Sequence, residues 1–280
     1  MIFDDRVCAL GEGAFWHPDR SEFFWFDILN KTLHSKAKSW AFDHMVSACG
    51  WIDRDTLLIA SDRALFCFDL TKGTQTHVAN LEADNPNTRS NDGRADPWGG
   101  FWISTMGLTA QPNAGSIYRF YKGELNQLFT NITIPNAICF APDKSCAYFS
   151  DSGAKIVWRQ PLDDLGWPQG DRQVFLNFTD QDFGPDGAVT DANGTFWNAQ
   201  WGAGRVAAYD PKGQFIHAVA LPALHTSCPA FGGPDLTDLY VTSATQNLSD
   251  QDLANTPEHG QTFVVNAVST GLPEPRILLD

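Results

Sequence analysis

The chain has 280 residues, 43% of them hydrophobic, and its 19 Lys and Arg against 33 Asp and Glu give a formal net charge of −14. Such a surface repels nucleic-acid phosphates and anionic lipid, so we expect no nucleic-acid partner and no membrane partner. A neutral substrate or a bound cation is compatible with it. Closed all-β folds can hold a chain of about this length in one domain, and we expect residues 1–280 to form one.

The first residues, MIFDDRVCALGEG, are acidic where a secretory signal needs a basic stretch followed by an apolar run. No apolar segment approaches the ~20 residues of a membrane span. These features predict a cytoplasmic protein, which we expect to be a monomer or a weak homodimer. The six cysteines include several in apolar runs such as LFCFD and AICFAP, so we expect reduced thiols. No Cys-x-x-Cys or Cys/His pattern indicates structural zinc.

One phrase repeats along the chain: an aspartate in a turn, followed five and six residues later by two apolar residues. Its six copies are spaced by 34 to 48 residues and begin at Asp19, Asp53, Asp96, Asp143, Asp191 and Asp235. Most copies precede a second strand-like run, and a period in the forties with several short strands is typical of a propeller blade. The pattern predicts an all-β, six-bladed β-propeller with four-stranded antiparallel blades around a central channel. The alternative is another antiparallel fold, because Asp turns are common in all of them.

Three longer polar stretches, at 71–90, 160–184 and 245–260, are predicted to be loops between strands. The innermost strand of a propeller blade begins beside the channel, so residues that precede the repeated aspartates should converge there from different blades. The candidates five to seven positions before each aspartate are Glu12, Ser47, Asn91, Asn136, Asp186 and Cys228. We expect them to share one position of the repeat and one strand face.

Two carboxylates and an amide at this position, Glu12, Asp186 and Asn136, would surround one axis. Carboxylates this close repel each other unless a proton or a cation lies between them. An all-oxygen set with a charge of −2 suits Ca²⁺, Mg²⁺ or Mn²⁺ and tolerates Zn²⁺ or Fe²⁺, so the channel is predicted to contain one divalent cation. Three ligands leave positions for water and substrate. Taken singly, each residue is also compatible with an ordinary turn.

The chain resembles the regucalcin/gluconolactonase-like family of six-bladed propellers, which includes luciferin-regenerating enzymes. The resemblance rests on phrases in the family's order: LGEGAFWHPDRSEFFWFDI, RSNDGRADPWGGFWISTMG, IPNAICFAPDKSCAYFSDS, GPDGAVTDANGTFWNAQWGAGRVAAYDPKG and TSCPAFGGPDLTDLYVTSA. It implies hydrolysis of a small-molecule sugar lactone with one divalent cation. By the same resemblance Glu12, Asn136 and Asp186 bind the metal, and Asp186 is the general base. Arg89 and Asn91, in the R-x-N-D-G phrase, bind substrate hydroxyls.

The sequence departs from the family pattern at two places. Animal members carry an acidic pair shortly after the Thr-Met of the third blade, and TMGLTAQPNAG has no acid there. The substrate contact made by one of those acids is therefore absent. The strand head PNA replaces the commoner P-N-G, which leaves the ligand Asn136 in place.

Two mechanisms and two other functions stay open from the residues alone. Asp186 can take a proton from water, or a hydroxide held by the metal can attack the lactone directly. The other functions are a non-catalytic metal-binding propeller and a metal-dependent esterase or phosphotriesterase. Polar Arg89 and Asn91 favour lactones over apolar esters. No G-x-S-x-G or H-E-x-x-H motif indicates another hydrolase.

Four further residues have two interpretations each. His44 and His225 are placed near the channel mouth, although an isolated histidine is more often a surface or core residue. Cys228 at a strand head is interpreted as a buried small residue rather than a nucleophile. Trp201, in QWGAG, belongs to the blade core or forms the floor of the pocket.

Overall fold

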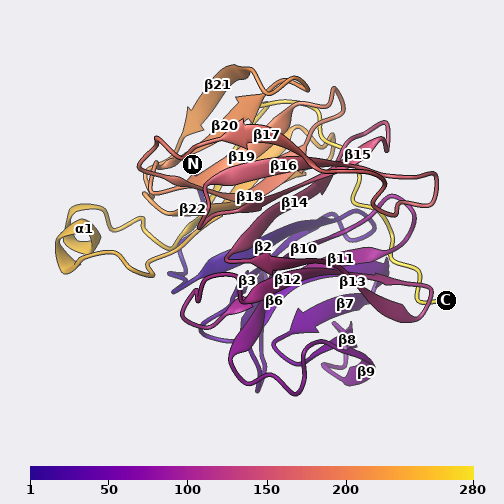
Figure 1. The fold of residues 1–280 in the computed structure, drawn as a ribbon. Helices are drawn as coiled ribbons and strands as arrows, with labels where there is room; N and C mark the ends of the chain where they lie inside the picture. Colours follow the sequence, from indigo (N-terminus) through magenta and orange to yellow (C-terminus); the bar gives the residue numbers. More distant parts are fainter.

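The computed structural model describes residues 1–280 and contains 24 β-strands and one α-helix of six residues. The strands form six separate four-stranded sheets whose strands pair antiparallel, arranged as blades around a central axis (Figure 1). The predicted six-bladed β-propeller is therefore confirmed. No helix has the length and apolar character needed to cross a membrane.

The first three blades, each given from its innermost strand outward, follow the chain order. Blade one contains β2 (Gly11–His17), β3 (Glu22–Asp27), β4 (Thr32–Ser35) and β5 (Ser39–Ala41). Blade two contains β6 (Val46–Asp53), β7 (Thr56–Ser61), β8 (Ala64–Asp69) and β9 (Gln75–Asn80). Blade three contains β10 (Thr88–Ala95), β11 (Phe101–Gly107), β12 (Gly115–Tyr121) and β13 (Glu124–Ile132).

The last three blades close the ring, and the sixth takes its outermost strand from the start of the chain. Blade four contains β14 (Pro135–Phe140), β15 (Cys146–Asp151), β16 (Ile156–Pro161) and β17 (Gln173–Asn177). Blade five contains β18 (Gly184–Thr190), β19 (Phe196–Trp201), β20 (Arg205–Tyr209) and β21 (Phe215–Ala220). Blade six contains β22 (Thr226–Gly232), β23 (Asp238–Ser243), β24 (Thr262–Val265) and β1 (Ile2–Asp4).

The repeated aspartates close the hairpin between the first and second strands of several blades. Asp96 Oδ1 accepts hydrogen bonds from the backbone N–H groups of Trp98 and Gly100, both at 2.9 Å. Asp191 Oδ1 accepts equivalent bonds from Asn193 and Thr195, also at 2.9 Å. An aspartate side chain that satisfies turn N–H groups fixes the turn geometry. The repeat seen in the sequence is therefore a repeat of this hairpin.

The apolar core is divided into six clusters, one at each junction between neighbouring blades. One cluster joins Phe24 and Phe26 of blade one to Leu57 and Ile59 of blade two. Trp102 and Trp197 are almost fully buried in two other clusters. Each blade is thus held by both neighbours, which fixes where its innermost strand meets the channel.

The polar stretches predicted as loops contain regular structure, so that prediction was wrong in part. The stretch at 71–90 contains β9, the one at 160–184 contains β17, and the one at 245–260 contains the helix α1 (Asp250–Asn255). Both strands are outermost in their blades and pack on one side only, so their residues are mostly polar or exposed. The helix projects from the propeller (Figure 1), begins with a Ser249–Asp252 capping box and buries none of its residues.

Both ends of the chain fasten blades together. Phe3 of β1 packs edge-on against Phe23 and Tyr240, with ring centroids 5.6 and 5.0 Å apart, which joins blades one and six. Residues 266–280 have no regular secondary structure and cross one face of the propeller, where they contact residues near the far ends of the innermost strands (Figure 1). In this segment, which we call the C-terminal strap, Ile277 N donates to Trp51 O and Leu278 N donates to Gly99 O, both at 2.8 Å.

Candidate active site

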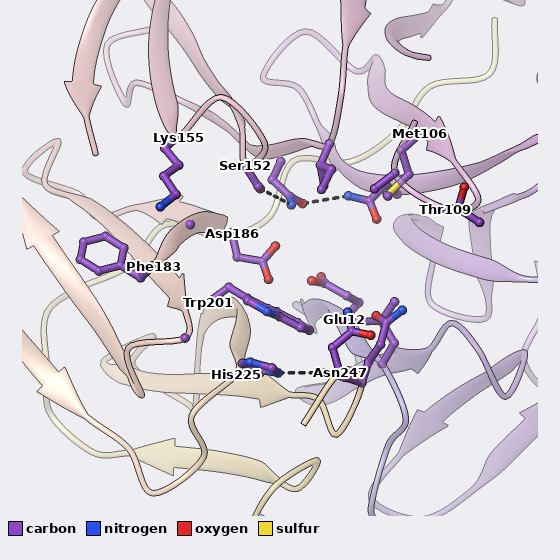
Figure 2. Close-up of a pocket in the computed structure, with 18 of the residues that line it drawn as sticks. Glu12, Met106, Thr109, Ser152, Lys155, Phe183, Asp186, Trp201, His225 and Asn247 are labelled. Atoms are coloured by element: carbon purple, nitrogen blue, oxygen red, sulfur yellow. Dashed lines mark hydrogen bonds between the residues drawn. The ribbon is translucent and has the colours of Figure 1, made fainter. Parts of the chain in front are cut away.

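A cavity of about 640 Å³ opens at the end of the channel where the innermost strands begin. The structure brings all five residues of the predicted site into its lining, where each side chain is buried. They come from four blades: Glu12 from β2, Arg89 and Asn91 from β10, Asn136 from β14 and Asp186 from β18. Figure 2 shows the carboxyl groups of Glu12 and Asp186 pointing toward one another. The roles assigned to these residues stay predictions.

The same irregularity places each side chain. At the start of every innermost strand the pairing slips, so that three residues of β2 (Glu12 to Phe15) advance beside two of β3. Equivalent one-residue bulges occur in the other five blades. A bulge re-aims the side chains beside it, and here it turns them into the channel.

The bulges correct the expected alignment of the repeat. Glu12 and Asn136 lie at the first position of the slip, whereas Asp186 and Asn91 lie one residue further along. Two consecutive positions of a regular strand would face opposite sides of the sheet. The bulge allows both positions to reach the pocket. The prediction that the candidates share one position of the repeat was therefore wrong, although Glu12, Asn91, Asn136 and Asp186 all line the same pocket.

Gly13 shows how tightly this bend is packed. Its φ of +58° lies in the left-handed region, and a Cβ there would be 2.3 Å from Ser47 O. The equivalent position in blade four is Ala137, which adopts a φ of 59° despite its side chain. The replacement of P-N-G by PNA therefore retains the bend, with some backbone strain.

A line of hydrogen bonds connects three of the predicted residues. Arg89 Nη1 donates to Asn91 Oδ1 at 2.8 Å, and Asn91 Nδ2 donates to Asn136 Oδ1 at 3.0 Å. Arg89 Nη1 also donates to Ser90 O at 2.8 Å. Burial lowers the pKa of Arg89 to about 10, so its guanidinium is still cationic at neutral pH.

The two carboxylates are electrostatically unfavourable without a counter-charge. Burial, and after it the nearby charge of Asp92, raise the pKa of Glu12 to about 8. Burial, then Glu12 and Asp92, raise the pKa of Asp186 well above its ordinary value. Arg89 is the basic side chain that opposes these shifts. A site with this excess of negative charge favours either protons or a cation.

The donor atoms fit a hard divalent cation. Carboxylate and amide oxygens are the ligands that Ca²⁺ and Mg²⁺ prefer. The structure contains no group of three His, Cys, Asp or Glu side chains arranged as metal ligands, so a cation would need the amide oxygen of Asn136 as the third protein ligand. Asp92 does not line this cavity, and its Oδ2 accepts the N–H of Ile138 at 2.7 Å.

Residues outside the predicted set complete the pocket. Trp201 lines it and stacks on His225, with ring centroids 4.1 Å apart and planes 18° from parallel. His225 Nδ1 bonds to Gln246 O at 3.0 Å, and because a carbonyl only accepts, Nδ1 carries the proton. Ser152 and Lys155, from the turn after β15, were missed because the repeat has no polar signal there.

The segment TMGLTAQPNAG of the third blade, which contains no acidic residue, lines another part of the pocket. Met106, Leu108, Thr109 and Ala110 all line the cavity, and none can act as an anionic acceptor. The structure thus agrees with the absence of an acidic substrate contact in TMGLTAQPNAG.

The two remaining candidates lie outside this lining. His44 lines a separate surface cavity and pairs with Asp62 Oδ1 at 3.1 Å. Cys228 is buried, and burial raises its thiol pKa well above the ordinary value, which agrees with a packing role. All six cysteines are free.

The fold and the site define a class: six-bladed propellers whose channel mouth carries buried acidic and amide side chains. The model for the family described as "SMP-30/Gluconolactonase/LRE-like region" matches residues 10–245, and the chain belongs to this family.

Individual relatives match nearly the whole chain. A protein of Rhizobium meliloti (strain 1021), provisionally named a sugar lactone lactonase, is 40% identical over 98% of this chain and 96% of its own. The L-arabinolactonase of Azospirillum brasilense is 33% identical over 98% of this chain and 94% of its own. Among solved structures, a calcium-binding regucalcin from Agrobacterium tumefaciens has 42% identity and a TM-score of 0.97, covering 99% of this chain and 96% of that one.

Proposed function

We propose that this protein hydrolyses a sugar lactone to the open-chain aldonic acid with the help of one divalent cation. The observation that carries the proposal is the meeting of Glu12, Asn136 and Asp186 beside Arg89 and Asn91 in one cavity. Relatives that match nearly the full length are named lactonases, including the L-arabinolactonase, which supports the reaction class. Which sugar is used depends on contacts around the whole ring.

Glu12, Asn136 and Asp186 would hold the cation through their oxygen atoms. When bound there, a divalent cation supplies Lewis-acid polarisation of the lactone carbonyl. Asp186 takes a proton from the attacking water, whose oxygen bonds to the carbonyl carbon. The ring C–O bond then breaks, and Asp186 passes the proton that it took from water to the ring oxygen, which leaves as a hydroxyl. General-base assistance of this kind contributes about 10²–10⁴-fold to the rate.

The hydrogen bonds within the pocket assign different tasks to Arg89 and Asn91. Both N–H groups of Arg89 Nη1 are occupied, while Nη2 and Nε stay available as donors to substrate oxygens. Asn91 Nδ2 is occupied by Pro135 O and Asn136 Oδ1, so Asn91 can only accept a further hydrogen bond, through Oδ1. Arg89 is therefore the donor that orients the lactone, and Asn91 mainly positions its neighbours.

Trp201 adds an apolar surface to this polar pocket. Its indole is backed by His225 and partly exposed in the cavity. A flat aromatic face suits the C–H groups of a sugar ring. We assign Trp201 to the floor of the substrate pocket.

The decisive test is a panel of sugar lactones offered to metal-stripped protein reloaded with Ca²⁺, Mg²⁺, Mn²⁺, Zn²⁺ or Fe²⁺. We expect turnover only with metal, and Asp186→Asn, which keeps the side-chain shape, should lose at least about 10²-fold in kcat while the protein stays folded. Tight metal binding without turnover would identify a non-catalytic binder. Faster hydrolysis of aryl esters or organophosphates would instead indicate an esterase.

A further inference from the structure

Ser152 lies directly after β15, in the wall of the pocket, and makes two short hydrogen-bond contacts. Its Oγ is 2.5 Å from Pro185 O, the carbonyl that precedes Asp186. The same Oγ is 2.9 Å from the terminal amide of Asn136 (Figure 2). The hydroxyl thus connects the strands that carry Asn136 and Asp186.

The chemistry of these contacts fixes which way the Asn136 amide faces. A backbone carbonyl can only accept, so the single hydroxyl proton of Ser152 goes to Pro185 O. Ser152 Oγ must then accept the second bond, and the Asn136 atom beside it must be Nδ2. The amide oxygen Oδ1 is consequently held on the opposite side of the group.

Asn91 contacts the other end of the amide and requires the same orientation. Its Nδ2 lies 2.9 Å from Pro135 O, an atom that only accepts, so this end of Asn91 is the donor end. The second proton of Nδ2 is directed to Asn136, 3.0 Å away, which again requires Oδ1 there. Two backbone carbonyls, from Pro135 and Pro185, therefore set the direction of both amides. Asn136 Oδ1 retains one lone pair for a ligand.

We propose that Ser152 is a positioning residue for the cation: it holds the Asn136 amide so that Oδ1, and not Nδ2, is presented to the pocket. The inference rests on the proposed function, because it assumes that Asn136 is a ligand. Asn91 holds the Oδ1 end of this amide and Ser152 holds the Nδ2 end, so without Ser152 the amide is held at one end only. Outer partners that orient a ligand typically affect metal affinity 10–100-fold.

The test compares Ser152→Ala with Ser150→Ala in the metal-stripped full-length protein. Ser150 lies opposite Asn136 in the sheet, is fully buried, and has a hydroxyl without a hydrogen-bond partner. It is a matched control for the loss of one hydroxyl. Calorimetric titration with Ca²⁺ and with Mn²⁺ should show about 10–100-fold weaker binding for Ser152→Ala. Ser150→Ala should bind as the wild type does, and both metal-free variants should keep the wild-type circular dichroism.

A second background separates amide orientation from support of the pocket wall. In Asn136→Asp both terminal atoms are oxygens, so the direction of the group no longer matters. Adding Ser152→Ala to this variant should weaken cation binding by less than about threefold. A carboxylate presents an oxygen in either orientation, so it does not need Ser152 to orient it. A loss as large as in the wild-type background would assign Ser152 to the wall and overturn the inference.

The outcomes also distinguish this inference from the proposed function. If the wild type binds cation and hydrolyses lactones while Ser152→Ala binds equally well, only the role of Ser152 is refuted. If the wild type neither binds cation nor hydrolyses lactones, the proposed function fails and the inference fails with it.

Discussion

Arg89 is the residue whose free donors decide how the pocket holds a polyhydroxylated ring. Its Nη1 is committed to Ser90 O and Asn91 Oδ1, which leaves Nη2 and Nε for the substrate. Its charge also opposes the repulsion between Glu12 and Asp186. Removing it should therefore affect substrate binding and the electrostatics of the carboxylates together.

For Arg89→Ala we expect kcat/KM for sugar lactones to fall about 10–100-fold, as for the loss of charged hydrogen bonds worth about 1.5–3 kcal/mol. Steady-state kinetics with saturating cation measures this. Arg54→Ala, at an exposed position, is the control for losing a positive charge. Unchanged kinetics for several lactones would refute the orienting role of Arg89.

The site residues differ in how far the sequence predicts them. Glu12, Asn136 and Asp186 are found because each begins an apolar strand in a repeating phrase. Ser152 and Lys155 are not found, because they lie in the turn after a second strand, where serine and lysine are ordinary surface residues. Their proximity to the pocket depends on the curvature of the blade, which no local pattern records.

At the scale of the strand, one bulge repeated in six blades builds the pocket. Without it, residues at successive positions such as Glu12 and Gly13 would alternate between the two faces of the sheet. The sequence does not reveal the bulge, since the register depends on pairing with the second strand of the blade. It does reveal second strands such as β3 (EFFWFD) and β7 (TLLIAS), because these are apolar on both faces. Outer strands such as β9 and β17 are not predicted from the sequence, because one of their faces is in contact with solvent and their residues do not form an apolar run.

Gly13→Ala tests the bulge in blade one. The new Cβ would meet Ser47 O at 2.3 Å and would require a residue with a side chain at a φ of +58°. We expect a loss of about 2–4 kcal/mol in the free energy of unfolding, from backbone strain plus the clash. Denaturant titration measures it.

Gly73→Ala is the matched control for this experiment. Gly73 has a φ of +72°, but no atom lies within 4 Å of the position of its Cβ. It should cost about 1–2 kcal/mol, from backbone strain alone. Equal losses for the two variants would show that the contact with Ser47 O is not important for the bulge.

At the scale of the whole molecule, stability depends on a closed ring of six blade junctions. We propose that residues 1–280 unfold as one unit, because each cluster of the core contains residues from two blades. The repeated phrase predicts six blades, but it does not predict that the start of the chain supplies the outermost strand of blade six. The three residues Ile2–Asp4 contain no repeated phrase, yet they complete blade six.

Phe3→Ala tests the closure. It removes the ring that packs on Phe23 of blade one and on Tyr240 of blade six. Because Phe3 is partly exposed, we expect a loss of about 2 kcal/mol, below the cost at a fully buried site. Calorimetry should show one transition, shifted to lower temperature. Val7→Ala, at a side chain that is 56% exposed, should leave it in place. Two separate transitions in the wild type would contradict a single unit.

The C-terminal strap has a consequence for how molecules reach the pocket. Glu274 of the strap pairs with Arg94, whose Nη2 also lies 3.4 Å from both Ala188 O and Pro229 O, atoms of two other blades. These contacts link blades three, five and six behind the carboxylates, and the cavity on that far side shares no lining residue with the active-site cavity. Substrate and product therefore use the same opening of the pocket. The acid must be released through it before the next lactone can bind.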